Sequence, residues 1–182
     1  MKTTRVRFMV FMGLLACLPG SRASADTPLP PPQRKEVWCG SRHYCAVMDP
    51  RLRLTTVYKV DGDTRKKLWA MPGWYRTAFL ADDGEHLVIG HEGVNLLPLS
   101  VESSDILAYF LRRGEVIATV TLSDLIEDKS SLRRTASHYL WGEYLGIDED
   151  CRFRVKTVEG RRLWFDVQTG KQVLSAVTPA PP

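Results

Sequence analysis

The fold class is decided by three consecutive stretches, RFRVKTV (residues 152–158), EGRR (159–162) and LWFDV (163–167). Two runs of β-branched and aromatic residues flank a short polar turn, and the turn contains Gly160. This arrangement is typical of an antiparallel hairpin, because such side chains favour strands and glycine permits the turn backbone. The sequence therefore predicts a chain that is mostly β.

The hairpin pattern occurs three more times along the chain. Strand pairs are predicted at residues 55–60 with 67–71, 75–80 with 86–90 and 106–111 with 116–120, followed by a short strand at 172–174. Val60-Asp61-Gly62 is echoed by Val158-Glu159-Gly160, which suggests repeated supersecondary modules. We expect three consecutive four-strand meanders, at about residues 36–71, 74–121 and 138–174.

Helix competes with strand in two segments. Residues 106–111 can begin a capped helix that ends at Gly114, but residues 116–120 need an antiparallel partner, so strand is preferred there. Residues 123–135 are the better helical candidate, because Ser123 can cap a helix and Asp124 suits its positive first turn. We expect one or two turns of connector helix at this place.

Two short motifs carry a resemblance to a known architecture. FLADDGEHLV (residues 79–88) resembles the Asp-Gly turn of β-propeller blades, and WFDVQTGK (164–171) is similar to the outer hairpin of blades in YVTN- or WD-repeat proteins. The resemblance implies a scaffold that binds proteins or ligands, and in some members an enzyme, without pointing to particular residues here. Propellers usually close with at least four blades, whereas about three are counted in this chain, so the fold is expected to be propeller-like or a β-sandwich.

The first 25 residues have the features of an export signal. A positive start precedes an apolar run at residues 8–18, and Ala23-Ser24-Ala25 fits a signal-peptidase site. Cleavage there predicts a secreted or periplasmic protein that starts at Asp26. An alternative is a lipobox at residues 14–17, in which Cys17 is acylated and the protein is held at the membrane, and a second alternative is a retained helix.

Composition divides the remainder of the chain. Residues 26–34 are rich in proline and are expected to form an extended linker, and residues 175–182 are expected to form a disordered proline-rich tail. Residues 35–174 are long enough for a single β domain with its own core.

The charge balance argues against a nucleic-acid partner. Lys2, Arg5, Arg7 and Arg22 are four of the 25 basic residues, so the 21 that remain after cleavage equal the 21 acidic residues. A nucleic-acid binder needs a retained basic excess, because neutralisation of phosphates drives such binding.

Three cysteines remain after cleavage. Cys39 and Cys45 flank a predicted five-residue turn, and in an oxidising compartment we expect them to form a disulfide across a hairpin. Cys151 is then either a free thiol or the partner of one of the other two. Three cysteines without CxxC spacing do not predict a zinc site.

Catalytic chemistry finds little support in the sequence. Nucleotide and haem motifs, the GxSxG motif and the HExxH motif are absent, and His86 and His91 lie an odd five residues apart on a strand, so their side chains point to opposite faces. The acidic stretches at residues 82–83 and 148–150 suggest acid–base chemistry, calcium binding or solvated turns. Solvated turns are preferred, because residues 148–150 lack the alternating oxygen ligands of an EF-hand loop. We expect no catalytic residue, no cofactor and no bound metal.

Residues 138–144 (HYLWGEY) are the densest aromatic group of the chain and the strongest candidate for a binding surface. We expect this group to lie mainly in a core strand, and the alternative is an interface, where exposed Trp and Tyr are favoured anchors. The residues of the candidate interaction surface are Arg133, Arg134, His138, Tyr139, Trp141 and Tyr144.

The sequence thus predicts an exported, non-catalytic binding or interaction module of the cell envelope. Its partner is expected to be another protein or a second copy of the chain, with membrane attachment only if Cys17 is lipidated. The alternatives are a hydrolase or metal-dependent periplasmic enzyme with a site scattered over turns, and an envelope lipoprotein acylated at Cys17.

Overall fold

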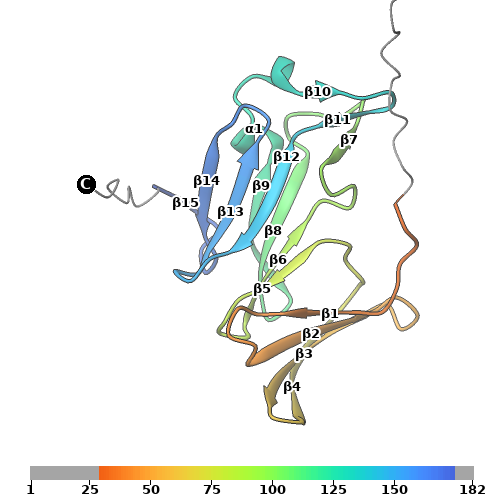
Figure 1. Cartoon of the computed structure of the whole chain (residues 1–182), viewed down its shortest axis with the longest axis vertical. Helices are drawn as coiled ribbons and strands as arrows, with labels where there is room; N and C mark the ends of the chain where they lie inside the picture. Colours follow the sequence, from red (N-terminus) through yellow and green to blue (C-terminus); the bar gives the residue numbers. More distant parts are fainter. Residues whose placement is uncertain (1–28, 175–182) are drawn as a thin grey trace, which may run out of the picture.

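The computed structural model describes residues 29–174 of the chain, and these residues form consecutive antiparallel sheets (Figure 1). The first sheet has the strand order β1-β2-β3-β4. Its strands are β1 (Lys35–Trp38), β2 (Tyr44–Asp49), β3 (Leu54–Asp61) and β4 (Thr64–Pro72).

The second and third sheets also have four strands each. The second sheet consists of β5 (Ala78–Leu80), β6 (His86–Gly90), β8 (Ile106–Arg112) and β9 (Glu115–Thr121). The third consists of β12 (Gly142–Ile147), β13 (Arg152–Thr157), β14 (Arg162–Asp166) and β15 (Gln172–Val173). A small fourth sheet has the order β10-β11-β7 and consists of β7 (Leu96–Pro98), β10 (Arg133–Arg134) and β11 (His138–Leu140).

The prediction of a mostly β chain built from four-strand meanders is confirmed. Residues 106–112 form strand β8, as the need for an antiparallel partner indicated. The connector helix is shorter than residues 123–135. It is one turn, α1 (Leu122–Leu125), capped by Thr121 rather than by Ser123, and a 3-10 turn, η1 (Lys129–Ser131), follows it. The helix stops because Ile126 already has an extended backbone conformation.

The second sheet is the centre of the domain, because it has a hydrophobic core on each face. Leu87, Val88 and Ile89 of β6 alternate between the two cores, as successive residues of a strand must. One core lies between the first and second sheets and includes Leu87 and Ile89. The other lies between the second and third sheets and includes Val88 and Phe153. Apolar residues on both faces explain why β6 is a continuous apolar run in the sequence.

The first strands of the three large sheets come together. β5 contacts both β1 and β12, although each of these strands is hydrogen-bonded only within its own sheet in the described part of the chain. Figure 1 shows β1 and the rest of the first sheet at the lower end of the view, with the second and third sheets above it.

The internal sequence echo does not mark equivalent positions in the sheets. The turn with Gly62 joins β3 and β4, the third and fourth strands of the first sheet, whereas the turn with Gly160 joins β13 and β14, the second and third strands of the third sheet. Both glycines have positive φ, +55° and +82°, with open space around them. The echo therefore reflects shared turn chemistry.

The predicted Cys39–Cys45 disulfide is wrong in this structure, in which both residues are buried free thiols. Trp38 pairs with Cys45, and the amide of Cys39 donates to the carbonyl oxygen of Tyr44 at 3.1 Å. Cys39 therefore lies opposite Tyr44, across a turn one residue shorter than expected. Because neighbouring strand residues point to opposite faces, the two thiols lie on opposite faces of the first sheet.

Residues 29–34 lie along the domain without regular secondary structure. The indole Nε1 of Trp74 donates to the carbonyl oxygen of Gln33, and a guanidinium nitrogen of Arg76 donates to that of Pro30, both at 2.8 Å. The expected leader at residues 1–25, its Cys17 and the expected tail at residues 175–182 lie outside the described residues. Between residues 29 and 174 no helix has the length and apolar character needed to cross a membrane.

Candidate binding cavity and apolar groove

A cavity of about 500 Å³ lies where β1, β5 and the end of β12 meet. Its apolar and aromatic wall is formed by side chains of these three strands, namely Val37, Trp38, Phe79, Leu80 and Ile147. Its polar rim is formed by Ser41 and by three carboxylates, Asp82, Asp148 and Glu149. A concave site with an apolar wall and a few polar groups is the usual form of a ligand pocket.

Asp82 is held in place by the turn between β1 and β2. The backbone amide of Ser41 donates to Asp82 Oδ1 at 2.7 Å, and this hydrogen bond lowers the pKa of Asp82 below its ordinary value. Gly40 leaves room for this contact, since a Cβ atom there would lie 3.2 Å from Asp82 Oδ2, which is tighter than an ordinary contact. Asp82 is therefore an ionised, oriented acceptor at neutral pH.

Asp148 and Glu149 differ in how they are engaged. Asp148 accepts hydrogen bonds from the amides of Asp150 and Arg152, at 3.1 and 2.9 Å, and from Arg152 Nε at 3.1 Å. Arg152 also contacts Asp150 at 2.5 Å, so its charge is shared between two carboxylates. Glu149 is exposed at the mouth of the cavity.

The thiol of Cys151 lies in the same acidic corner. Partial burial raises the pKa of Cys151, and the carboxylates of Asp83, Asp82 and Asp148 raise it further. A thiol with a raised pKa is a poor nucleophile at neutral pH, because the thiolate is the reactive form. The corner as a whole is electronegative.

The described residues contain no group of three or more His, Cys, Asp or Glu side chains arranged to hold a metal ion. His86 Nδ1 lies 2.6 Å from Asp83 Oδ2, and the amide of His86 donates to the other oxygen of the same carboxylate. His91 Nδ1 accepts from the amide of Gly93 at 3.1 Å, and burial lowers the pKa of His91. Each imidazole thus stabilises a turn next to it in the sequence through these contacts.

An apolar groove of about 630 Å³ lies at a second place, where the first sheet leaves part of the second sheet uncovered. Met71 and Tyr75 form one side, and Ile89, Tyr109 and Val116 of the second sheet form the other. Tyr109 and Val116 are 37% and 56% exposed, which is high for large apolar or aromatic side chains on adjacent strands.

The candidate interaction surface is wrong for Trp141 and Tyr144, for which the preferred core-strand interpretation holds. Trp141 is fully buried, and its indole Nε1 donates to the carbonyl oxygen of Val94 at 3.0 Å. Tyr144 packs against the core between the second and third sheets; its hydroxyl accepts from the amide of His91 at 2.9 Å and donates to the carbonyl oxygen of Leu107 at 2.5 Å. Both rings belong to the core, because the described sheets pack face to face around them.

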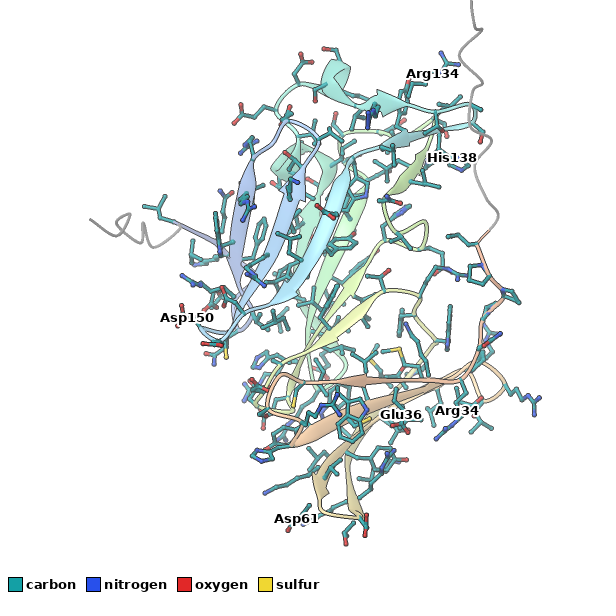
Figure 2. The ribbon with its side chains drawn as sticks, in the orientation of Figure 1. Arg34, Glu36, Asp61, Arg134, His138 and Asp150 are labelled. Atoms are coloured by element: carbon teal, nitrogen blue, oxygen red, sulfur yellow. The ribbon has the colours of Figure 1, made fainter. Side chains whose placement is uncertain are left out.

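The other four residues of the predicted surface lie in the small sheet. Arg133 and Arg134 are exposed on β10, and His138 and Tyr139 are half-buried on β11. Figure 2 shows Arg134 and His138 at one end of the molecule, far from Asp150, which lies beside the acidic corner at the tip of the third sheet. The predicted surface and the cavity are therefore separate.

Sequence reasoning missed the cavity itself. The acidic stretches at residues 82–83 and 148–150 were expected to be separate solvated turns, but the structure brings them to one corner. The sequence signal for the cavity is weak. Each acidic turn directly follows a β-rich run, but this pattern does not show that the two runs meet in the fold.

The chain matches no protein-family model and no curated protein.

Proposed function

We propose that the domain is an exported, non-catalytic binding module of the cell envelope, and that its cavity receives a cationic side chain of a polypeptide partner. The observation that carries this proposal is the combination, in one cavity, of an apolar wall with a carboxylate rim. The location follows from the predicted leader.

The chemistry of the cavity favours a lysine or arginine side chain. Val37, Phe79 and Ile147 can cover an alkyl stem, and Asp82 and Glu149 can pair with the charge at its end. Arg152 is already engaged by Asp148 and Asp150, so it competes little for the rim. Two more cations of the chain, Arg42 and Arg65, lie over the ring of Trp38. A carboxylate ligand would meet like charges and is disfavoured.

The expected affinity for one side chain is modest. Four buried methylene groups contribute about 3 kcal/mol, and one partly exposed ion pair contributes about 1 kcal/mol. The sum corresponds to a dissociation constant of about 1 mM for an isolated side chain. Tighter binding of a whole partner requires further contacts beside the cavity.

The local hydrogen bonds support binding rather than catalysis. The backbone amide of Ser41 donates to Asp82 and lowers the pKa of that carboxyl group, which is therefore a poor proton donor at neutral pH. The thiol of Cys151, with its raised pKa, is a poor nucleophile.

Heteronuclear NMR titration of the mature chain, residues 26–182, tests the proposal. The probe is N-acetyl-lysine methylamide, and the matched control probe is N-acetyl-norleucine methylamide, which has the same stem without the charge. We expect the lysine compound to shift resonances of residues 37–41, 79–82 and 147–149 with a dissociation constant of about 1 mM, and the norleucine compound to bind several-fold more weakly.

Variants of the rim complete this test. The double substitution Asp82→Asn with Glu149→Gln removes two rim charges while keeping side-chain size and the acceptor for Ser41, and we expect several-fold weaker binding of the lysine compound. Glu115→Gln, at an exposed carboxylate on β9, is the control and should leave binding unchanged. Equal binding of the two probes, or no effect of the double substitution, contradicts the proposal.

A further inference from the structure

We propose that the free edge of β9 pairs with β9 of a second copy of this chain, antiparallel about a two-fold axis, so that two second sheets become one eight-stranded sheet. β9 is the edge of the second sheet opposite to β5, which lines the cavity, so its pairing does not depend on the proposed ligand.

The edges of the first and second sheets are protected very differently. β4 is the last strand of the first sheet, and it carries Arg65, Lys66 and Lys67 in succession, which is the usual device against edge-to-edge pairing. β9 is the last strand of the second sheet, and within residues 29–174 it pairs only with β8. Residues 116–121 of β9 are uncharged and mostly β-branched, so this edge has strong strand propensity and no charge to repel a partner.

Exposed apolar side chains gather beside this edge. Val116 and Ile117 on β9 are 56% and 41% exposed, and Tyr109 on the adjacent strand β8 is 37% exposed. Val116 and Tyr109 also line the apolar groove. An edge with an adjoining apolar face is the kind of surface to which an extended strand adds, because it offers both backbone hydrogen bonds and side-chain burial.

The register of β9 permits pairing with itself. Ile117 is the extra residue of a bulge opposite Leu111, so the regular part of β9 is residues 118–121, in which Ala118 and Val120 face the core between the second and third sheets. An antiparallel pair centred on Thr119 places Ala118 opposite Val120 of the second copy. Residues opposite each other in an antiparallel pair must point to the same face, and this register satisfies that condition.

Charges at the ends of β9 suit the same arrangement. Glu115, the one charged residue of β9, falls outside the regular segment, before the bulge at Ile117. The turn at the start of β9 follows Arg112 and Arg113, which share the single carboxylate of Glu85. Antiparallel pairing brings this turn towards Asp124 in α1 of the second copy. Parallel pairing would instead place Glu115 beside Glu115 of the second copy, and the two like charges would repel each other.

Sedimentation of the mature chain, residues 26–182, over a concentration series tests the proposal. We expect the mass of a dimer at about 100 μM and dissociation on dilution. Thr119→Lys should abolish the dimer, because the two new charges would face each other across the two-fold axis. Thr64→Lys, an exposed position at the start of the charged strand β4, is the control and should leave the dimer intact.

A disulfide trap tests the register without relying on loss of function. Thr119→Cys in a Cys151→Ser background places a cysteine opposite its own copy, at a Cα separation of about 4.5–5.5 Å that a disulfide can span. We expect a covalent dimer on mild oxidation, and no such product from Thr64→Cys in the same background.

A monomer at every concentration, a dimer that Thr119→Lys leaves unchanged, or a Thr119→Cys variant that does not cross-link overturns the proposal. None of these results bears on the lysine titration, so failure of this inference is distinguishable from failure of the proposed function. Far-ultraviolet circular dichroism on each variant establishes that it is folded.

Discussion

Ser41 and Asp82 are 41 residues apart in the sequence, and their hydrogen bond joins the first sheet to the second. Ser41 lies in the turn that follows β1, and Asp82 lies just after the end of β5. The amide of Ser41 donates to Asp82 Oδ1 at 2.7 Å. The hydrogen bond fixes the rim of the cavity at the point where the first and second sheets meet. It also ties the rim to the stability of the domain.

Removal of the Asp82 carboxylate should therefore destabilise the protein in a pH-dependent way. Because the folded-state pKa of Asp82 is lowered, its stabilising contribution is present above the ordinary aspartate pKa of about 3.9 and is lost as pH falls through the lower folded value. We expect Asp82→Ala to cost about 1 kcal/mol at pH 7 and less at a pH well below the ordinary aspartate pKa. Urea denaturation at the two pH values measures this, and Asp82→Asn, which keeps an acceptor for Ser41, should lose less at pH 7.

Gly84 should tolerate substitution much less well than Gly62. Gly84 has φ of +69°, and a Cβ atom there would lie 2.3 Å from the ring of Tyr44. We expect Gly84→Ala to cost roughly 3 kcal/mol, because backbone strain adds to displacement of a ring that packs on the core. Gly62→Ala, with φ of +55° and open space, carries the strain alone and should cost about 1 kcal/mol. Equal losses of unfolding free energy for the two variants would contradict the role given to Tyr44.

Trp141 and Arg134 provide a direct test of the corrected interaction surface. Trp141 is fully buried and contacts Tyr144 with ring centroids 4.8 Å apart, so Trp141→Ala should cost about 3–5 kcal/mol of unfolding free energy. Arg134 is exposed, and Arg134→Ala should change that free energy by less than about 0.5 kcal/mol. Chemical denaturation monitored by circular dichroism compares the two. A loss of less than about 1 kcal/mol on Trp141→Ala would contradict the burial of this ring.

The elements that the sequence predicted best are those governed by local chemistry. Paired β-rich runs with glycine turns gave the hairpins correctly, because strand propensity and turn conformation are properties of neighbouring residues. The predictions were wrong where the position of a side chain depends on strand register or on the packing of one sheet against another. A turn shorter by one residue moved Cys45 to the face opposite Cys39, and burial of Trp141 and Tyr144 depended on how the third sheet packs on the second. The cavity could not be predicted, because Val37, Phe79 and Ile147 meet only through packing between sheets.

The three thiols of residues 29–174 should differ in reactivity. Cys45 is completely buried, and burial together with the carboxylate of Glu36 raises its pKa to about 11, so at pH 8 almost none of it is thiolate. Cys39 is 3% exposed, whereas Cys151 is half-buried at the protein surface. We expect iodoacetamide to modify Cys151 first in the native protein and to reach Cys39 and Cys45 only after unfolding, because access and thiolate fraction both limit alkylation.

Mass spectrometry of the alkylated protein and of its peptides measures this order. Alkylation after unfolding without reductant should add three groups to residues 26–182, and prior treatment with reductant should not change that number, since the structure has three free thiols. Cys151→Ser is the control and should make the native protein nearly inert to the reagent. The opposite result is that only one cysteine is alkylated without reductant and that Cys39 and Cys45 are recovered in one cross-linked peptide. It would show that the two residues form the disulfide that the turn geometry argues against.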